Sequence, residues 1–189
     1  LFTDDDVRRI KLTAVTAADV NERISAIRQL LLTPVSANDK ASVFINLLGD
    51  SEARVRAEAA VALEGLGLNT NVASAIGDMA GGNTKQRLLA ARRLTPLIEH
   101  GGELEVFVVA RSLIRSLDGE ESIEVRLAIL EAFASAGAKI AHHEVERQGI
   151  VEAMVQQLRE FPDRLRPQVA TALRALVSEQ AEPVIRQLW

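Results

Sequence analysis

One helical pattern recurs five times along this 189-residue chain, and it constrains the fold more than any other feature of the sequence. Each copy has an arginine, a small or apolar residue three positions later, and a large apolar residue seven positions later. Residues spaced by three and seven lie on one face of an α-helix, so each copy predicts a helix with a buried seam. The arginines that begin the five copies are Arg23, Arg56, Arg87, Arg126 and Arg166.

These arginines recur at intervals of roughly 30 to 40 residues, a range typical of stacked helical repeats. Alternating apolar and polar runs joined by Asn-Gly turns are missing, so the prediction is an all-α fold in one domain, residues 1–189. The predicted helical hairpins are about 3–33, 36–67, 70–100, 102–137 and 145–179, followed by a half-repeat at 182–189.

Local signals predict where several helices begin and end. Thr3, followed by three aspartates, is expected to cap the first helix, and Gly67 is expected to close the helix before it. Gly77 predicts a short or frayed helix, and Pro96 predicts a kink or an early end. Gly137 is expected to stop its helix.

The string DSEARVRAEAAVALEGLG, residues 50–67, resembles the second helix of a HEAT repeat, in which an acid precedes a Val-Arg pair, small residues and a leucine. An acid stands six residues before the arginine in three copies, as Asp50, Glu120 and Glu160, whereas Ala17 and Gly81 take that position in the others. The resemblance implies a right-handed α-solenoid of about five repeats. It also implies a structural ladder, in which the five arginines each bridge to an acid in the same or a neighbouring repeat.

HEAT-like proteins include scaffolds, transport receptors, lyases and DNA-repair proteins, so the resemblance leaves several functions open. We expect non-catalytic binding of a protein or peptide partner through the concave groove of the stack. A lyase of the bilin-lyase type, or a subunit of an enzyme complex, is the alternative. Nucleic-acid binding is disfavoured by the net charge of −4 and by an aromatic content of 3%.

The second helices of HEAT-like stacks are expected to line the concave face. Positions two, five and six after each arginine point away from the seam, and the charged residues there are the candidate partner-binding set. This set is Arg28, Glu58, Arg92, Arg93 and Glu131. The arginines would meet an acidic partner and the glutamates would fix its register, so alanine at Arg92 and Arg93 should weaken partner capture without changing helicity.

The sequence predicts no catalytic residue, metal site or cofactor. His142, His143 and Glu144 form a cluster, but adjacent residues on a helix do not face one another, and His-Glu-x-x-His spacing is absent. No apolar run approaches the ~18 residues that a membrane span requires. Without a basic region followed by an apolar run at its start, the sequence favours a cytoplasmic location.

Overall fold

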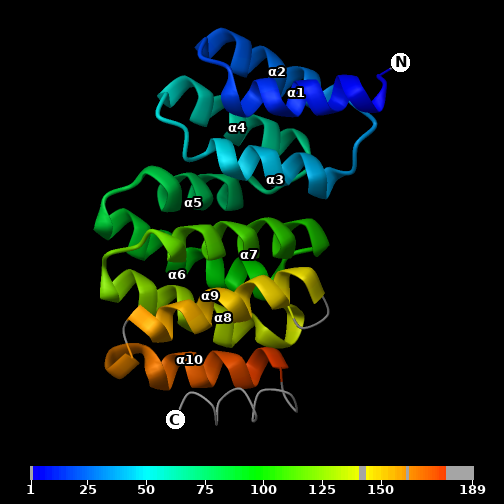
Figure 1. Ribbon diagram of the computed structural model, residues 1–189. Coiled ribbons are helices and arrows are strands. Elements are labelled where there is room, and N and C mark those ends of the chain that lie inside the picture. The colour runs from blue at the N-terminus through cyan, green and yellow to red at the C-terminus, as the bar shows by residue number, and fades with distance from the viewer. Residues whose placement is uncertain (1, 141–143, 161, 178–189) are drawn as a thin grey trace.

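The computed structural model describes residues 2–140, 144–160 and 162–177, and this part contains ten α-helices and no strand (Figure 1). The all-α prediction is therefore confirmed, while the predicted half-repeat at 182–189 lies outside the described residues. The helices are α1 (Asp4–Thr16), α2 (Val20–Leu32), α3 (Ala37–Leu47), α4 (Ala53–Gly65), α5 (Thr70–Gly81), α6 (Thr84–His100), α7 (Glu103–Asp118), α8 (Ile123–Ile140), α9 (Glu144–Glu160) and α10 (Pro162–Val177).

The repeated seam is buried at every position. At three residues after the arginines, exposure is 3% or less, and at seven residues after them it is 1% or less. Both sets lie on α2, α4, α6, α8 and α10. The buried seam residues are Ala26, Leu30, Ala59, Leu63, Ala90, Leu94, Ile129, Phe133, Val169 and Leu173.

Two predicted helix ends are confirmed. The Thr3 hydroxyl accepts a hydrogen bond from the Asp6 amide at 3.2 Å, and the Asp6 carboxylate accepts one from the Thr3 amide at 3.0 Å. This reciprocal capping box satisfies two amides that the helix itself leaves free. Gly67 has a φ of +93°, a left-handed conformation that glycine adopts at little cost. It lies in the turn that follows α4.

Pro96 does not end its helix, and the helix end predicted at Gly137 is wrong, whereas the short helix expected around Gly77 is the 12-residue α5. Helix α5 runs without a break through Gly77, and α6 continues past Pro96 to His100. Leu94 and Ile98 on either side of the proline are fully buried, and their burial offsets the cost of the lost hydrogen bond. Helix α8 likewise continues beyond Gly137 to Ile140, because that glycine serves close packing against α10 rather than helix termination.

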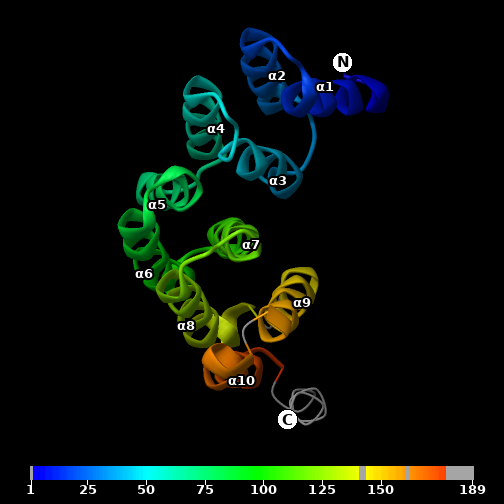
Figure 2. The same ribbon diagram turned by 60° about the vertical axis from the view of Figure 1, so that its left-hand side comes forward.

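The helices lie in two curved layers (Figure 2). In the outer layer, α2 packs on α4, α4 on α5, α5 on α6, α6 on α8, and α8 on α10. In the inner layer, α1 packs on α3, α3 on α7, and α7 on α9. Among the described residues α1 and α10 make no contact, so the two ends of the stack remain apart.

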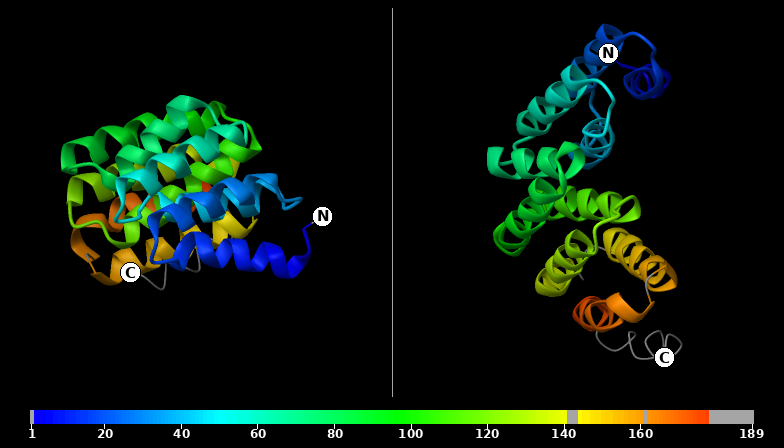
Figure 3. Two further views of the ribbon diagram at one scale, coloured as in Figure 1. Left: turned by 90° about the horizontal axis from the view of Figure 1, so that it is seen from above. Right: turned by 90° about the vertical axis from the view of Figure 1, so that its left-hand side faces the viewer.

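Helix α5 breaks the regular alternation of the layers. As the first helix of its hairpin it would lie between α3 and α7, but α3 packs directly on α7, and no contact joins α4 to α6 in the described part. Helix α5 instead lies in the outer layer between α4 and α6. Because packed helices are about 8–10 Å apart, six outer helices span a longer arc than four inner ones. The stack therefore curves with the inner layer on its concave side, as both Figure 2 and the right-hand view of Figure 3 show.

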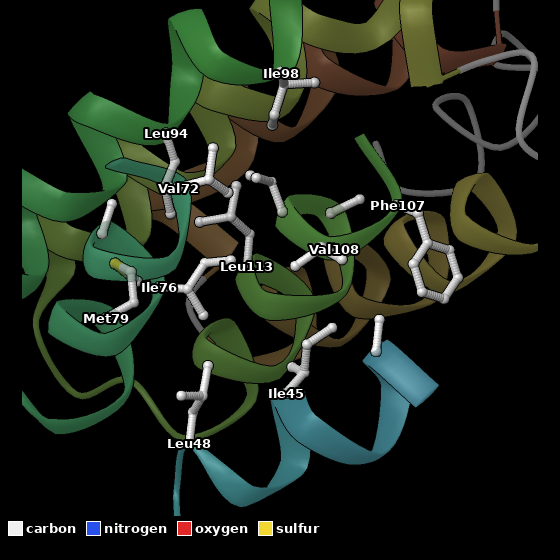
Figure 4. Close-up of a cluster of buried hydrophobic side chains, with 14 of the residues drawn as sticks. Ile45, Leu48, Val72, Ile76, Met79, Leu94, Ile98, Phe107, Val108 and Leu113 are labelled. Atoms are coloured by element: carbon white, nitrogen blue, oxygen red, sulfur yellow. The ribbon is translucent and has the colours of Figure 1, made fainter. Parts of the chain in front are cut away.

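The core between the layers is continuous, and Figure 4 shows the part of it where α7 packs on α3 and on α5. Ile45 and Leu48 at the end of α3 are 4% and 2% exposed, and Ile76 of α5 is 1% exposed. Val108 and Leu113 of α7 are fully buried, because α7 has neighbours in both layers. Through these contacts α7 joins α3 of the inner layer to α5 of the outer layer.

Candidate functional site

The arginines of the ladder hold the turns within their own hairpins. Arg23 donates to the carbonyl oxygen of Ala17 at 2.6 Å, and Arg87 donates to that of Gly82 at 2.9 Å. Arg56 donates in the same way to the carbonyl oxygens of residues 50 and 51, both at 2.8 Å. Carbonyls that follow a helix lack intrahelical partners, so each guanidinium satisfies them and fixes the angle between two helices.

Two of these arginines also bind a carboxylate from the next hairpin. The Arg23 Nη2 and Asp50 Oδ1 atoms are 3.1 Å apart, and both side chains are 10% exposed. Arg87 forms a two-pronged pair with Glu120, at 2.7 Å from Nε to Oε2 and 2.9 Å from Nη2 to Oε1. Asp50 and Glu120 are the acids that stand six residues before Arg56 and Arg126. Each therefore links its own hairpin to the preceding hairpin.

Glu120 is the more deeply buried of these two acids, with 3% exposure. Burial raises the pKa of its carboxyl, but hydrogen bonds from Arg87 and from the Ser122 amide, together with the charge of Arg126, lower that pKa below its usual value. The ionised form is therefore the stable one in the folded protein.

The C-terminal members of the ladder have other surroundings. Arg126 is 5% exposed and donates to the side-chain oxygen of Gln157, whose amide in turn faces the Leu117 carbonyl at 3.4 Å. Gln157 thus joins Arg126 of α8 to α9 and to the end of α7. Arg166 is half-buried on α10.

Arg56 differs from Arg23 and Arg87 because Gly81 stands where the next hairpin would have the acid. A Cβ atom on Gly81 would lie 3.8 Å from the Arg56 Nε atom, and within the described residues no carboxylate pairs with this arginine. The missing acid coincides with the place where α4 fails to contact α6. The ladder is interrupted at the point where α5 enters the outer layer.

Gly81→Asp is expected to supply this carboxylate and to raise the free energy of unfolding by about 0.5–1 kcal/mol, the range of a partly exposed ion pair. Urea unfolding monitored by circular dichroism measures the change. Gly81→Asn is the matched control, since it has the same shape without the charge. Equal stability of the two variants would show that Arg56 does not reach this position.

The structure pairs two of the predicted partner-binding residues with each other. Arg28 of α2 donates to Glu58 of α4 through Nε at 2.7 Å and Nη2 at 2.9 Å. These hydrogen bonds lower the pKa of Glu58 and raise the pKa of Arg28. The pair borders an outer groove of about 440 Å³ between α2 and α4, and its charges already neutralise each other.

The other three predicted residues lie further along the outer layer. Arg93 of α6 is 3.3 Å from Asp78 of α5, while Arg92 and Glu131 are exposed and form no ion pair within the described residues. All five predicted residues are thus on outer-layer helices. The expectation that the second helices line the concave face is wrong, because the extra outer helix α5 places them on the convex side (Figure 3).

The concave side has its own grooves, which the sequence patterns did not reveal. A hollow of 210 Å³ lies between α3, α7 and α9, and one of 370 Å³ lies between α7 and α9. We call these two hollows the inner groove. Its lining residues shared by both hollows are Ile114, Arg115 and Gly149.

Arg115 lies at the centre of the inner groove. Its Nη1 atom donates to the Asn46 side chain at 2.7 Å and faces the Ile45 carbonyl at 3.4 Å. The absence of a side chain on Gly49 lets the guanidinium approach, since a Cβ there would be 2.8 Å from Nη2. All of these neighbours are neutral, and the described residues provide no carboxylate partner for Arg115.

Arg111 stands one helical turn before Arg115, and also lines the inner groove. Its guanidinium carbon is 5.7 Å from the centre of the Phe107 ring, a cation–π distance. Two arginines four residues apart on α7 thus face the inner groove, and Asp118 and Glu152 line its end between α7 and α9. Their four-residue spacing in the sequence could have indicated that both arginines lie on one face of a helix.

The described residues contain no group of three or more His, Cys, Asp and Glu side chains that could hold a metal ion. His142 and His143 lie outside the described residues. A search of the described helices finds none that is both long and apolar enough to cross a bilayer.

Comparisons with known proteins provide no family. No family model matches the sequence, and no curated protein matches it. A similar solved structure is the crystal structure of an engineered protein from the Northeast Structural Genomics Consortium, with 20% sequence identity and a TM-score of 0.47. The match covers 97% of this chain and 85% of that one, and similarity at this level carries no argument about function.

Proposed function

We propose that this chain is a HEAT-like, right-handed α-solenoid of about five hairpin repeats that binds a protein or peptide partner on its concave face. The repeated seam, the arginine ladder and the open two-layer stack support this assignment. A stack whose ends stay apart leaves its concave face accessible to an extended or helical segment.

The inner groove is the observation that carries the proposal. It follows α7 between α3 and α9, and its lining residues are mostly polar. Arg111 and Arg115, which form no ion pair among the described residues, lie there with Asp118 and Glu152. A cation held by neutral hydrogen-bond acceptors favours an anionic partner group. The proposed partner therefore presents an acidic group to Arg111 and Arg115, and it meets α7 rather than the outer helices.

Combined Arg111→Gln and Arg115→Gln substitutions are expected to reduce partner capture about tenfold or more, because each arginine loses a charge-assisted hydrogen bond. The same captured protein is quantified by mass spectrometry for the wild type and each variant. The control combines Arg92→Gln and Arg93→Gln on the outer layer, which should leave capture unchanged.

A photo-crosslinking amino acid identifies the face in contact. Placed at Ser42, which lines the inner groove, it should crosslink the captured protein, and placed at Glu131 on the outer layer it should not. Capture lost only in the outer variant, with crosslinks only from position 131, would contradict the concave-face proposal.

A further inference from the structure

The packing of the helices divides the described part of the stack into two halves. The first half is α1 to α4 and the second is α5 to α10. They meet where α3 packs on α7 and where α4 packs on α5, and no other pair of described helices joins them (Figure 2). The chain crosses from one half to the other in the short turn after α4, which contains Gly67 with its left-handed backbone. A few residues in such a turn can absorb the dihedral changes of a hinge.

The ion pairs of the stack lie within the halves, and none between described residues crosses from one half to the other. At the boundary Arg56, near the start of α4, has Gly81 opposite it, at the end of α5. Both positions lie at the ends of their helices remote from the Gly67 turn. A rotation about that turn would separate these ends the most, and no charge pair opposes the separation.

Arg115 provides hydrogen bonds across the boundary on the inner side. Its Nη1 atom donates to the Asn46 side chain at 2.7 Å and lies 3.4 Å from the Ile45 carbonyl oxygen, so it links α7 to the end of α3. Asn46 is exposed, so water can replace this bond at a modest cost. A pocket of 370 Å³ beside it has walls from both halves, among them Leu48 and Met79, so the halves are not packed tightly against each other there.

We propose that the two halves rotate about the Gly67 turn, and that the hydrogen bond between Arg115 and Asn46 holds the closed angle. The buried contacts of Ile45 and Leu48 limit the rotation, because full separation would expose both side chains. The inner groove is bordered by α3 on one side and by α7 on the other, so this angle sets the width of the groove. The inference goes beyond the proposed function and does not depend on it.

Distances between two spin labels measure the rotation. The chain has no cysteine, so introduced cysteines can be labelled selectively. Glu22→Cys on α2 with Glu124→Cys on α8 places one label in each half, at exposed positions near the starts of their helices. Asn71→Cys on α5 with Glu124→Cys is the control pair within the second half. Double electron–electron resonance gives the distribution of distances for each pair.

Asn46→Ala should raise the ratio of a second, longer distance to the original distance about tenfold for the spanning pair, and should leave the control pair unchanged. Adding Gly81→Asp, which offers Arg56 a carboxylate across the boundary, should restore the original distance, whereas adding Gly81→Asn should not. Asn38→Ala, at an exposed position near the start of α3, should leave both distributions as in the wild type. An unchanged spanning distance in Asn46→Ala, or equal broadening of both label pairs, would overturn the proposal.

Discussion

Glu120→Ala is expected to lower the free energy of unfolding by about 3 kcal/mol, near the lower end of the effect of breaking a buried ion pair. The Glu120 side chain is 2% exposed and that of Arg87 is 26% exposed, so the substitution leaves a poorly hydrated cation between two hairpins. It also removes the acceptor for the Ser122 amide at the start of α8. Urea denaturation measures the loss. The slope of the free energy of unfolding against urea concentration should stay unchanged.

Glu121→Ala is the matched control, because the neighbouring glutamate is exposed and its loss should change stability by less than about 0.5 kcal/mol. Equal unfolding midpoints for the two variants would contradict a structural role for the Arg87–Glu120 pair.

The effect of Glu120 should depend on pH in a defined direction. Its folded-state pKa is below the ordinary value of 4.5, so the unfolded chain takes up a proton first as the pH falls. The stabilising contribution is therefore fully present above pH 4.5 and is lost as the pH falls through the lowered folded pKa. The stability difference between wild type and Glu120→Ala should stay constant from neutral pH to about pH 5 and shrink in more acidic solution.

Gly137→Ala is expected to destabilise the protein by about 1–3 kcal/mol, and Gly137→Val by more, because both overpack the contact between α8 and α10. A Cβ on Gly137 would lie 2.6 Å from the Ala175 Cβ and 2.8 Å from the Ala175 carbonyl carbon. Backbone cannot rotate away as a flexible side chain can, so α10 has to move. Thermal and urea unfolding measure the change.

Gly77→Ala provides a control with the opposite sign. Gly77 lies inside α5, and a Cβ there would have no neighbouring atom within 4 Å. Its substitution should therefore stabilise the protein by up to about 1 kcal/mol through helix propensity. If Gly137→Ala were also stabilising, the close approach of α8 and α10 would be disproved.

The sequence predicts the helices and their buried faces because both depend on local periodicity. Ala59 and Leu63 follow Arg56 at the seam spacing, and both are fully buried. The capping box of Thr3 and the left-handed Gly67 are likewise local, and both are confirmed. Local signals fail where neighbouring residues are buried. At Pro96, for example, packing overrides the preference of a single residue, and the helix continues.

The sequence does not predict how successive hairpins are placed. Helix α5 has an ordinary amphipathic pattern, and nothing in that pattern indicates that it would join the outer layer. A local feature at the same place is Gly81, which stands where the motif would have the acid that Arg56 binds. Because α5 sets the direction of curvature, the concave face and Arg115 could not be found by extending a regular repeat.

Nuclear Overhauser effects between methyl groups test the central claim, the two-layer stack with α5 in its outer layer, most directly. We predict cross-peaks between methyl groups of α3 and α7, with Ile45 and Leu113 as reporters, and none between Leu63 of α4 and Leu94 of α6. Cross-peaks from Leu63 to Leu94, with none from α3 to α7, would show a regular alternation of hairpins and contradict the account.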